Sequence, residues 1–248
     1  MKKKFAICFS GYPRFIKTTA PNIKENFLDK IDSYDIYAQI QWNDDWQSTQ
    51  IHHEHDDKFE TNELEDFMQA YSDHNLKRIN VIKPYQFDTS FCITCKEPDM
   101  KLTVKQCQNM YYRHKCQYQG IADCIKLIDN LSDYEYIIRI RTDAIFEQKI
   151  DINKINTDHI LFQHGCRSGH TRYYSDYFMI VPITQVQFFE DLAKLEDHWK
   201  DGITHMHTLV ENVGKKYNME PCEFHTYNPS SSTYHGKLLK HYNHYHIA

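Results

Sequence analysis

The sequence predicts an α/β fold built on a largely parallel sheet. Short apolar segments typical of buried strands alternate with longer segments whose apolar residues recur every three or four positions, as in helices. Strands that alternate with helices imply a parallel sheet covered by helices. The chain has 248 residues, of which 41% are hydrophobic and 25% charged, so it is able to bury a sizeable core.

Six segments have the pattern of strands. The first ends in a Ser-Gly-Tyr-Pro turn, and Pro84 stops the third. Residues 136–141 form the clearest of them, because apolar and charged side chains alternate there with a period of two. The predicted strands are residues 4–9, 34–40, 78–82, 136–141, 160–162 and 177–181.

Five segments have the pattern of helices. The longest carries apolar side chains, from Met110 to Ile128, at intervals of three and four. The predicted helices are residues 22–30, 63–71, 103–131, 184–199 and 204–217. The segment from Cys222 onward is rich in Tyr, His, Ser and Asn, and it is predicted to be irregular.

The composition excludes several classes of protein. The net charge is −5, whereas a protein that coats nucleic acid should be basic, so no nucleic-acid partner is expected. Only 7 glycines occur, and the chain has no GxGxxG, GxxxxGK[ST] or GxSxG motif. The standard dinucleotide, P-loop and serine-hydrolase sites are therefore excluded.

The chain is also expected to have no membrane span, because no apolar run approaches the ~18 residues that a membrane helix needs. The N-terminal apolar stretch meets Gly11 after about five residues, short of the ~7–15 of a signal peptide. We therefore expect a cytoplasmic protein whose 8 cysteines are reduced thiols, several of them buried.

Polar residues follow the predicted strands, at the edge where α/β sheets bind ligands. After the first strand, Gly11 lets the backbone approach a ligand closely, and Arg14 offers two parallel hydrogen bonds to a phosphate. A tight turn with a solvated arginine is the alternative. After the second strand, Trp42 offers a flat ring for stacking on a base or sugar, or plugs the core beneath a polar loop.

The strongest signal lies in the fourth strand. Arg139, Arg141 and Asp143 share one face of that strand, while Ile138 and Ile140 share the other. Arginines on a central strand are costly to bury unless an anion meets them. The sequence leaves two alternatives open: an anionic ligand with a metal or ribose near Asp143, or a closed Arg–Asp network inside the protein.

These motifs together resemble a small GT-A-type glycosyltransferase of the kind encoded in bacterial surface-polysaccharide clusters and in large viruses and phages. Such proteins open with a strand and an SG-x-PR turn, matched by residues 10–14, and carry a YDYVIRxRxD-x-x-F element, matched by residues 134–146. Their second strand is rich in Tyr and Asp and runs into a Trp, and a later Asp precedes an apolar strand; residues 34–37, Trp42 and Asp176 match these features. The resemblance covers residues 1–220.

The resemblance implies a GT-A-like three-layer sandwich that forms a single domain over residues 1–248. Residues 1–145 would form the nucleotide-sugar half, and residues 146–248 the acceptor half and tail. The implied activity is transfer of a hexosyl or related group from a nucleotide-diphosphate-sugar donor to a glycan acceptor. The implied donor-binding residues are Ser10, Gly11, Arg14, Trp42, Arg139, Arg141 and Asp143.

The resemblance also implies a divalent cation, Mn²⁺ or Mg²⁺, on the diphosphate. Asp143 matches the last Asp of the DxD motif of this family, but Arg141 stands where the first Asp belongs. His225, in the histidine-rich tail, would complete the metal site with Asp143, although such a tail is otherwise a solvated surface. Asp176 follows a polar, aromatic segment and is the candidate general base that would take the proton of the acceptor hydroxyl.

Two other functions stay open. A non-catalytic module that binds a carbohydrate or a nucleotide would explain the missing first Asp. A metal-dependent phosphohydrolase would need several carboxylates that converge on two metal ions, and the strand ends do not supply them. The histidine cluster of residues 52–57 lacks the HExxH spacing of a metalloprotease. The cysteine pair of residues 92–95 has the spacing of a zinc knuckle, but no second CxxC or HxxxH follows it. Both segments are predicted to be loops.

Overall fold

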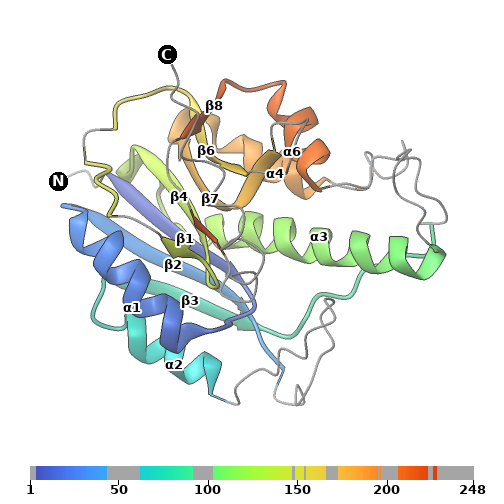
Figure 1. The fold of residues 1–248 in the computed structure, drawn as a ribbon, viewed down its shortest axis with the longest axis horizontal. Coiled ribbons are helices and arrows are strands. Elements are labelled where there is room, and N and C mark those ends of the chain that lie inside the picture. The colour runs from blue at the N-terminus through green and yellow to red at the C-terminus, as the bar shows by residue number, and fades with distance from the viewer. Residues whose placement is uncertain are drawn as a thin grey trace, which may run out of the picture.

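The computed structural model describes residues 4–43, 62–91, 103–146, 149–153, 155–165, 173–194, 196, 206–222 and 226–227. They form an α/β sandwich of three layers, in which helices cover both faces of a central sheet (Figure 1). The predicted fold class, a three-layer sandwich with a mostly parallel sheet, is therefore confirmed.

The central sheet contains seven strands among the described residues, in the order β3-β2-β1-β4-β7-β6-β8. Pairing is parallel from β3 to β4 and between β6 and β8, whereas β7 is antiparallel to both of its neighbours. The strands are β1 (Phe5–Gly11), β2 (Tyr34–Gln41), β3 (Leu76–Ile82), β4 (Tyr136–Arg141), β6 (Ile160–Gly165), β7 (Tyr173–Pro182) and β8 (Met219–Cys222). A separate pair joins β5 (Ile145–Phe146) to β9 (Thr226–Tyr227).

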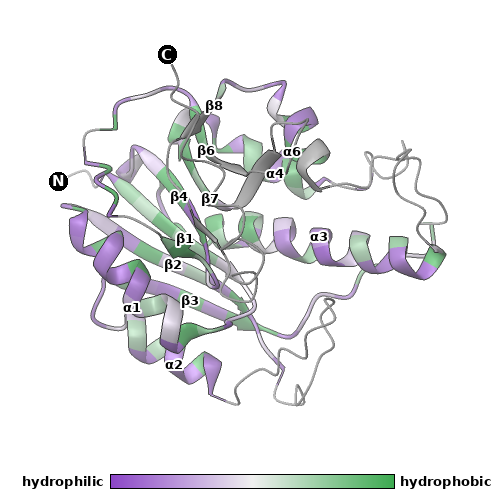
Figure 2. Ribbon diagram, in the orientation of Figure 1, coloured by the Kyte–Doolittle hydropathy of each residue, from purple (hydrophilic) through white to green (hydrophobic). Residues whose placement is uncertain are grey.

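Side chains of the inner strands alternate between two hydrophobic clusters, one on each face of the sheet. In β1, Phe5, Ile7 and Phe9 belong to one cluster, and Ala6 and Cys8 belong to the other. This alternation is the period of two that the sequence shows. Figure 2 shows the consequence, with hydrophobic residues gathered in the inner strands and a largely hydrophilic outer surface on the first helix.

Helices bury these two faces. α1 (Ile16–Asn26) and α2 (Glu63–Tyr71) cover one face, while α3 (Val104–Ile125), α4 (Gln187–Ala193) and α6 (Met206–Gly214) cover the other (Figure 1). Thr103 begins α3 with a capping box, in which its hydroxyl accepts from the Gln106 amide at 3.3 Å and its own amide donates to the Gln106 side chain at 2.8 Å. The single-turn 3₁₀ helices are Leu28–Lys30, Leu131–Asp133 and Ile183–Gln185.

The prediction of a first helix over residues 22–30 is wrong by about one and a half turns, because α1 begins at Ile16 and runs through Pro21. Phe15, at the N-cap, has a φ of 57° and gives no side-chain cap. The cap comes instead from Glu63, whose carboxylate accepts from the amides of Phe15 and Ile16 at 2.7 and 2.8 Å. A cap supplied by a distant helix leaves no local sequence signal.

Other differences lie at element ends and at a sheet edge. α3 ends at Ile125 rather than at residue 131, because the amides of Leu127 and Ile128 turn back to carbonyls three residues earlier. The described part of α4 ends at Ala193. The prediction that the chain is irregular from Cys222 onward is corrected by β9 and by Cys222, the last residue of β8. The rest of β8 was not predicted; it contains Pro221, which an edge strand tolerates.

Four cysteines of the described residues, Cys8, Cys107, Cys116 and Cys124, are buried free thiols, as predicted. Among the helices that the structure describes, none is both long and apolar enough to cross a membrane.

Glu63→Ala should destabilise the protein by about 2 kcal/mol, because two amides at the start of α1 lose a charged acceptor in a buried setting. Chemical denaturation measures this loss. Glu65→Ala is the matched control, since Glu65 lies in the same first turn of α2 but is exposed. Equal effects of the two substitutions would contradict the capping role.

Candidate functional site

A cavity of about 560 Å³ opens at the carboxyl ends of β1, β2, β3 and β4, against one side of α3. Its position is the one that α/β sheets use for ligands. The described residues that line it are Ser10, Gly11, Tyr12, Arg14, Gln41, Asn43, Lys83, Pro84, Gln86, Asn109, Tyr112, Arg113, His114, Cys116, Gln117, Arg139, Arg141, Thr142 and Asp143.

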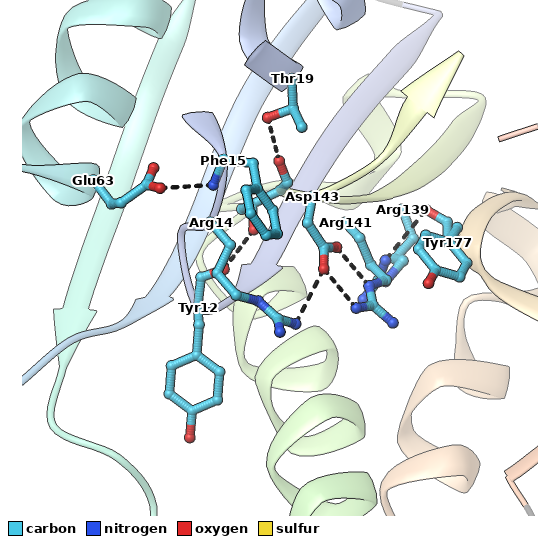
Figure 3. Close-up of polar contacts among 10 residues, drawn as sticks. Tyr12, Arg14, Phe15, Thr19, Glu63, Arg139, Arg141, Asp143 and Tyr177 are labelled. Atoms are coloured by element: carbon cyan, nitrogen blue, oxygen red, sulfur yellow. Dashed lines mark hydrogen bonds and ion pairs between the residues drawn. The ribbon is translucent and has the colours of Figure 1, made fainter. Parts of the chain in front are cut away.

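Asp143 lies in the wall of the cavity, held by two arginines (Figure 3). Arg141 donates from Nε to Oδ1 at 2.8 Å and from Nη2 to Oδ2 at 2.7 Å, a two-pronged contact. Nη2 of Arg14 lies 3.0 Å from Oδ2. The Asp143 side chain is 2% exposed, against 22% for Arg14 and 16% for Arg141, so the carboxylate is buried behind the two guanidinium groups.

Burial alone would raise the pKa of Asp143, but the charges of Arg141 and Arg14 and the hydrogen bond from Arg141 outweigh it, so this pKa lies well below its ordinary value. The pKa of Arg113 is also shifted by these charges. Desolvation, followed by the charges of Arg14 and Arg141, lowers the pKa of Arg113. The guanidinium groups thus repel one another across the cavity.

Arg139 is the most deeply placed of these arginines, and its side chain is 1% exposed. Its Nη1 donates to the carbonyl of Tyr177 in β7 at 3.3 Å, and its charge contributes to the lowered pKa of Asp143. The ring of Tyr177 lies under the Arg141 guanidinium, at 4.3 Å from its centroid to Cζ. The start of the antiparallel strand β7 therefore supports two arginines of the site.

The turn after β1 is fixed at several points. Gly11 has a φ of 112°, which favours glycine. Thr142 donates its hydroxyl to the carbonyl of Tyr12 at 2.5 Å, and the Thr142 carbonyl accepts from the hydroxyl of Thr19 in α1 at 2.8 Å. These bonds tie the turn to the end of β4, so that Arg14 meets Asp143 (Figure 3).

In the cavity wall, Ser10 Oγ, Arg14 Nε and Gln41 Oε1 are buried polar atoms without a hydrogen-bond partner among the described residues. The Ser10 and Gln41 side chains belong to residues that are 4% and 0% exposed. A buried polar atom without a partner costs about 1–3 kcal/mol, so this wall is built at some cost in stability.

Burial holds the Cys116 thiol of the wall in its neutral form. Burial raises the pKa of Cys116 to about 11, although hydrogen bonds with Tyr112 and Tyr12 lower it. Burial likewise raises the pKa of the Tyr12 and Tyr112 phenols. All three groups are therefore neutral at physiological pH, and they supply hydrogen bonds rather than charge.

Charge in the described lining is strongly one-sided. Lys83, Arg14, Arg113, Arg139 and Arg141 are cationic, whereas Asp143 is the one carboxylate among the described lining residues. The whole chain carries a formal net charge of −5. The cavity is thus a cluster of cationic side chains in a protein of negative net charge, which suits an anionic ligand.

Six of the predicted donor-binding residues meet in this cavity: Ser10, Gly11, Arg14, Arg139, Arg141 and Asp143. Trp42 is not among the lining residues, although its neighbours Gln41 and Asn43 are; its amide donates to the Ile82 carbonyl at 2.8 Å. The backbone of Asp176 lies in β7, and its side chain is outside what the structure describes. His225, like residues 52–57 and 92–95, lies outside the described residues, so the roles given to Trp42, Asp176 and His225 stay predictions.

The lining of the cavity by α3 was not predicted from the sequence. Asn109, Arg113 and Gln117 line the cavity and are spaced by four residues, so they form a polar stripe on the helix. That spacing was a usable signal, because it marks a second face beside the apolar one. Lys83, directly after β3, was equally accessible from the position of the strand end.

The described residues do not fit the predicted Mn²⁺ or Mg²⁺ site. These cations prefer several oxygen ligands, but both oxygens of Asp143 accept from arginines. Within the described ranges, no group of three or more His, Cys, Asp and Glu side chains lies together. No chemical step is therefore assigned to a metal ion here.

Comparisons with known proteins find likeness in structure only. No family model matches the sequence, and no curated protein sequence matches it significantly. The glycosyltransferase GlyE of Streptococcus pneumoniae TIGR4 matches 98% of this chain and 50% of its own at a TM-score of 0.47 and 8% identity. The chain thus spans half of the length of GlyE.

Two further solved structures are similar to a lesser degree. The galactosyltransferase LgtC, solved with donor and acceptor sugar analogues, matches 84% of this chain and 69% of its own, at a TM-score of 0.40 and 10% identity. A putative glucose-1-phosphate thymidylyltransferase from Bacillus anthracis matches 99% and 97%, at a TM-score of 0.42 and 9% identity. With every score below 0.5, these likenesses decide neither activity nor substrate.

Asp143→Asn should destabilise the protein by about 3 kcal/mol at neutral pH, the lower end of the cost of breaking a buried ion pair, because Arg14 and Arg141 keep some contact with solvent. Unfolded, Asp143 titrates near its ordinary pKa of about 3.9; folded, it titrates lower. Stability from this group is therefore present above that value and is lost as the pH falls through the folded pKa.

The difference in stability between the wild type and Asp143→Asn should consequently shrink in acid. Urea unfolding at neutral pH and at acidic pH below about 4 measures it. The exposed Asp73, changed to Asn, serves as the control. A difference that is the same at every pH would show that the ion pairs contribute nothing.

Proposed function

We propose that the chain is a GT-A-like glycosyltransferase, which transfers a sugar from a nucleotide-diphosphate donor to a hydroxyl group of a glycan. The observation that carries the proposal is the cationic cavity at the carboxyl ends of the parallel strands, with five cationic side chains and one carboxylate in its described lining. The SG-x-PR turn and the RxRxD element, on which the sequence resemblance rests, line this same cavity.

The chemistry of glycosyl transfer matches this arrangement. A nucleoside diphosphate leaves with additional negative charge as the bond from the sugar breaks, and fixed cations at that place stabilise the transition state. Arg14 and Arg141 are fixed by Asp143, and Arg139 by the Tyr177 carbonyl. Because these groups are oriented before the donor binds, they need little reorganisation during the reaction.

The proposed general base is Asp176. β7 is antiparallel to β4, with Ile140 paired to Phe178, so the first residues of β7 lie at the edge where β1, β2 and β4 end. The backbone position of Asp176 directly precedes Tyr177, whose carbonyl receives the hydrogen bond from Arg139. We propose that Asp176 accepts the proton of the acceptor hydroxyl.

A non-catalytic module that binds a nucleotide or a carbohydrate is the second candidate. The observation that favours it is the same Asp143, because its carboxylate serves as the counter-ion of Arg141, which occupies the place of the first Asp of the family motif. A module that binds a nucleotide would share its ligand with the enzyme and differ from it in turnover.

The test of the proposed function is a screen of UDP-, GDP-, ADP- and dTDP-linked hexoses by thermal shift, followed by assay of nucleoside diphosphate release with and without glycan acceptors. At 100 times its dissociation constant, a ligand adds about 2.7 kcal/mol of stability. We expect at least one donor to stabilise the protein and to be consumed, whereas the matching nucleoside, which lacks phosphate, does neither.

Stabilisation without any release of nucleoside diphosphate would favour the binding module. Absence of stabilisation by every nucleotide-sugar, with equal behaviour of the phosphate-free nucleosides, would refute a donor site in the cavity.

Asp176→Asn should lower transfer by ~10²–10⁴, the usual contribution of a general base, and leave donor binding unchanged. The turnover number and the dissociation constant of the donor are measured separately. Asp158→Asn, at an aspartate whose side chain is 83% exposed and which precedes β6, is the control. Normal turnover of the Asp176 variant would remove this residue from the mechanism.

A further inference from the structure

We infer that the diphosphate of the donor binds in this cavity without a divalent cation, held by Arg14, Arg113 and Arg141, and that Asp143 is a positioning residue for two of these arginines rather than a metal ligand. This inference rests on the proposed function, whose ligand it specifies. It departs from the metal-bridged diphosphate that the sequence resemblance implies.

Both carboxylate oxygens of Asp143 are occupied by arginines. Arg141 reaches both of its oxygens at 2.8 and 2.7 Å, and Arg14 shares Oδ2 at 3.0 Å. A divalent ion would have to displace both guanidinium groups from a carboxylate that is 2% exposed. The displaced charges would then lie next to the cation, which is unfavourable.

The cavity also offers few ligands for a divalent cation among its described residues. Mg²⁺ and Mn²⁺ are bound by several oxygens, usually including carboxylates. The described lining offers one carboxylate, surrounded by Lys83 and four arginines. Such a surface repels a small divalent cation and attracts an anion.

The arginines of the cavity can bind phosphate oxygens in place of a divalent cation. A guanidinium group offers a rigid set of donors that matches two phosphate oxygens at once. Arg14 and Arg141 keep 22% and 16% of their side chains exposed. Desolvation, followed by the charges of Arg14 and Arg141, lowers the pKa of Arg113 in the same wall. A bound diphosphate would accept from these donors and relieve the repulsion between the three arginines.

The experiment measures the binding of inorganic pyrophosphate and of UDP, GDP, ADP and dTDP by titration calorimetry, in buffer with EDTA and in buffer with Mn²⁺. We expect at least one nucleoside diphosphate to bind in EDTA, with an affinity within tenfold of that in Mn²⁺. Binding that appears only with Mn²⁺, or that Mn²⁺ tightens by more than tenfold, overturns the inference and leaves the proposed glycosyl transfer intact. Binding in neither buffer overturns both.

Two substitutions test which arginines bind the diphosphate. Arg141→Gln and Arg113→Gln should each weaken binding in EDTA by about 10- to 100-fold, the loss of a charge-assisted hydrogen bond. Arg141→Gln removes a partner of buried Asp143, so the folding of this variant is checked by thermal melting. Arg113→Gln tests binding at a solvent-exposed position of α3. Lys105→Gln removes an exposed charge from the same helix outside the cavity and should have no effect. Unchanged binding by Arg113→Gln in EDTA would contradict its place in the clamp.

Discussion

The burial of arginine at the end of a central strand is the constraint on which this structure depends. A guanidinium charge taken out of water costs several kcal/mol unless charges and hydrogen bonds replace the solvent. Arg139, at 1% exposure, meets the Tyr177 carbonyl, and Arg141 meets both oxygens of Asp143. Since Asp143 follows Arg141 by two residues, the compensating charge comes from the same strand end.

That compensation then extends to segments far apart in the sequence. Asp143 also holds Arg14, whose position depends on the turn after β1 and on the start of α1. Glu63, in α2, completes that start by accepting from the Phe15 and Ile16 amides. The site is therefore assembled by a chain of contacts that runs from β4 through the first turn to α2.

Much of this arrangement is readable from the sequence, because it depends on local periodicity. The period of two correctly places Arg139 and Arg141 on the face opposite Ile138 and Ile140. The Arg–Asp network, one of the two alternatives for Asp143, is present and lies in the wall of a cavity. The rest depends on tertiary contact. The early start of α1 follows from Glu63, 47 residues away from Ile16, and Pro221 disguises β8, whose place at the sheet edge cannot be read from four residues.

The uneven distribution of charge limits the size of the ligand. Electrostatic influence in water decays over about 8 Å at physiological ionic strength, so the positive potential of the cavity reaches little beyond its mouth. A compact anion fits within that range, whereas an extended polyanion would also lie along the surface of a protein whose net charge is −5. A short diphosphate would therefore meet the cationic cavity alone, whereas a long polyanion would also meet the rest of a chain of negative net charge.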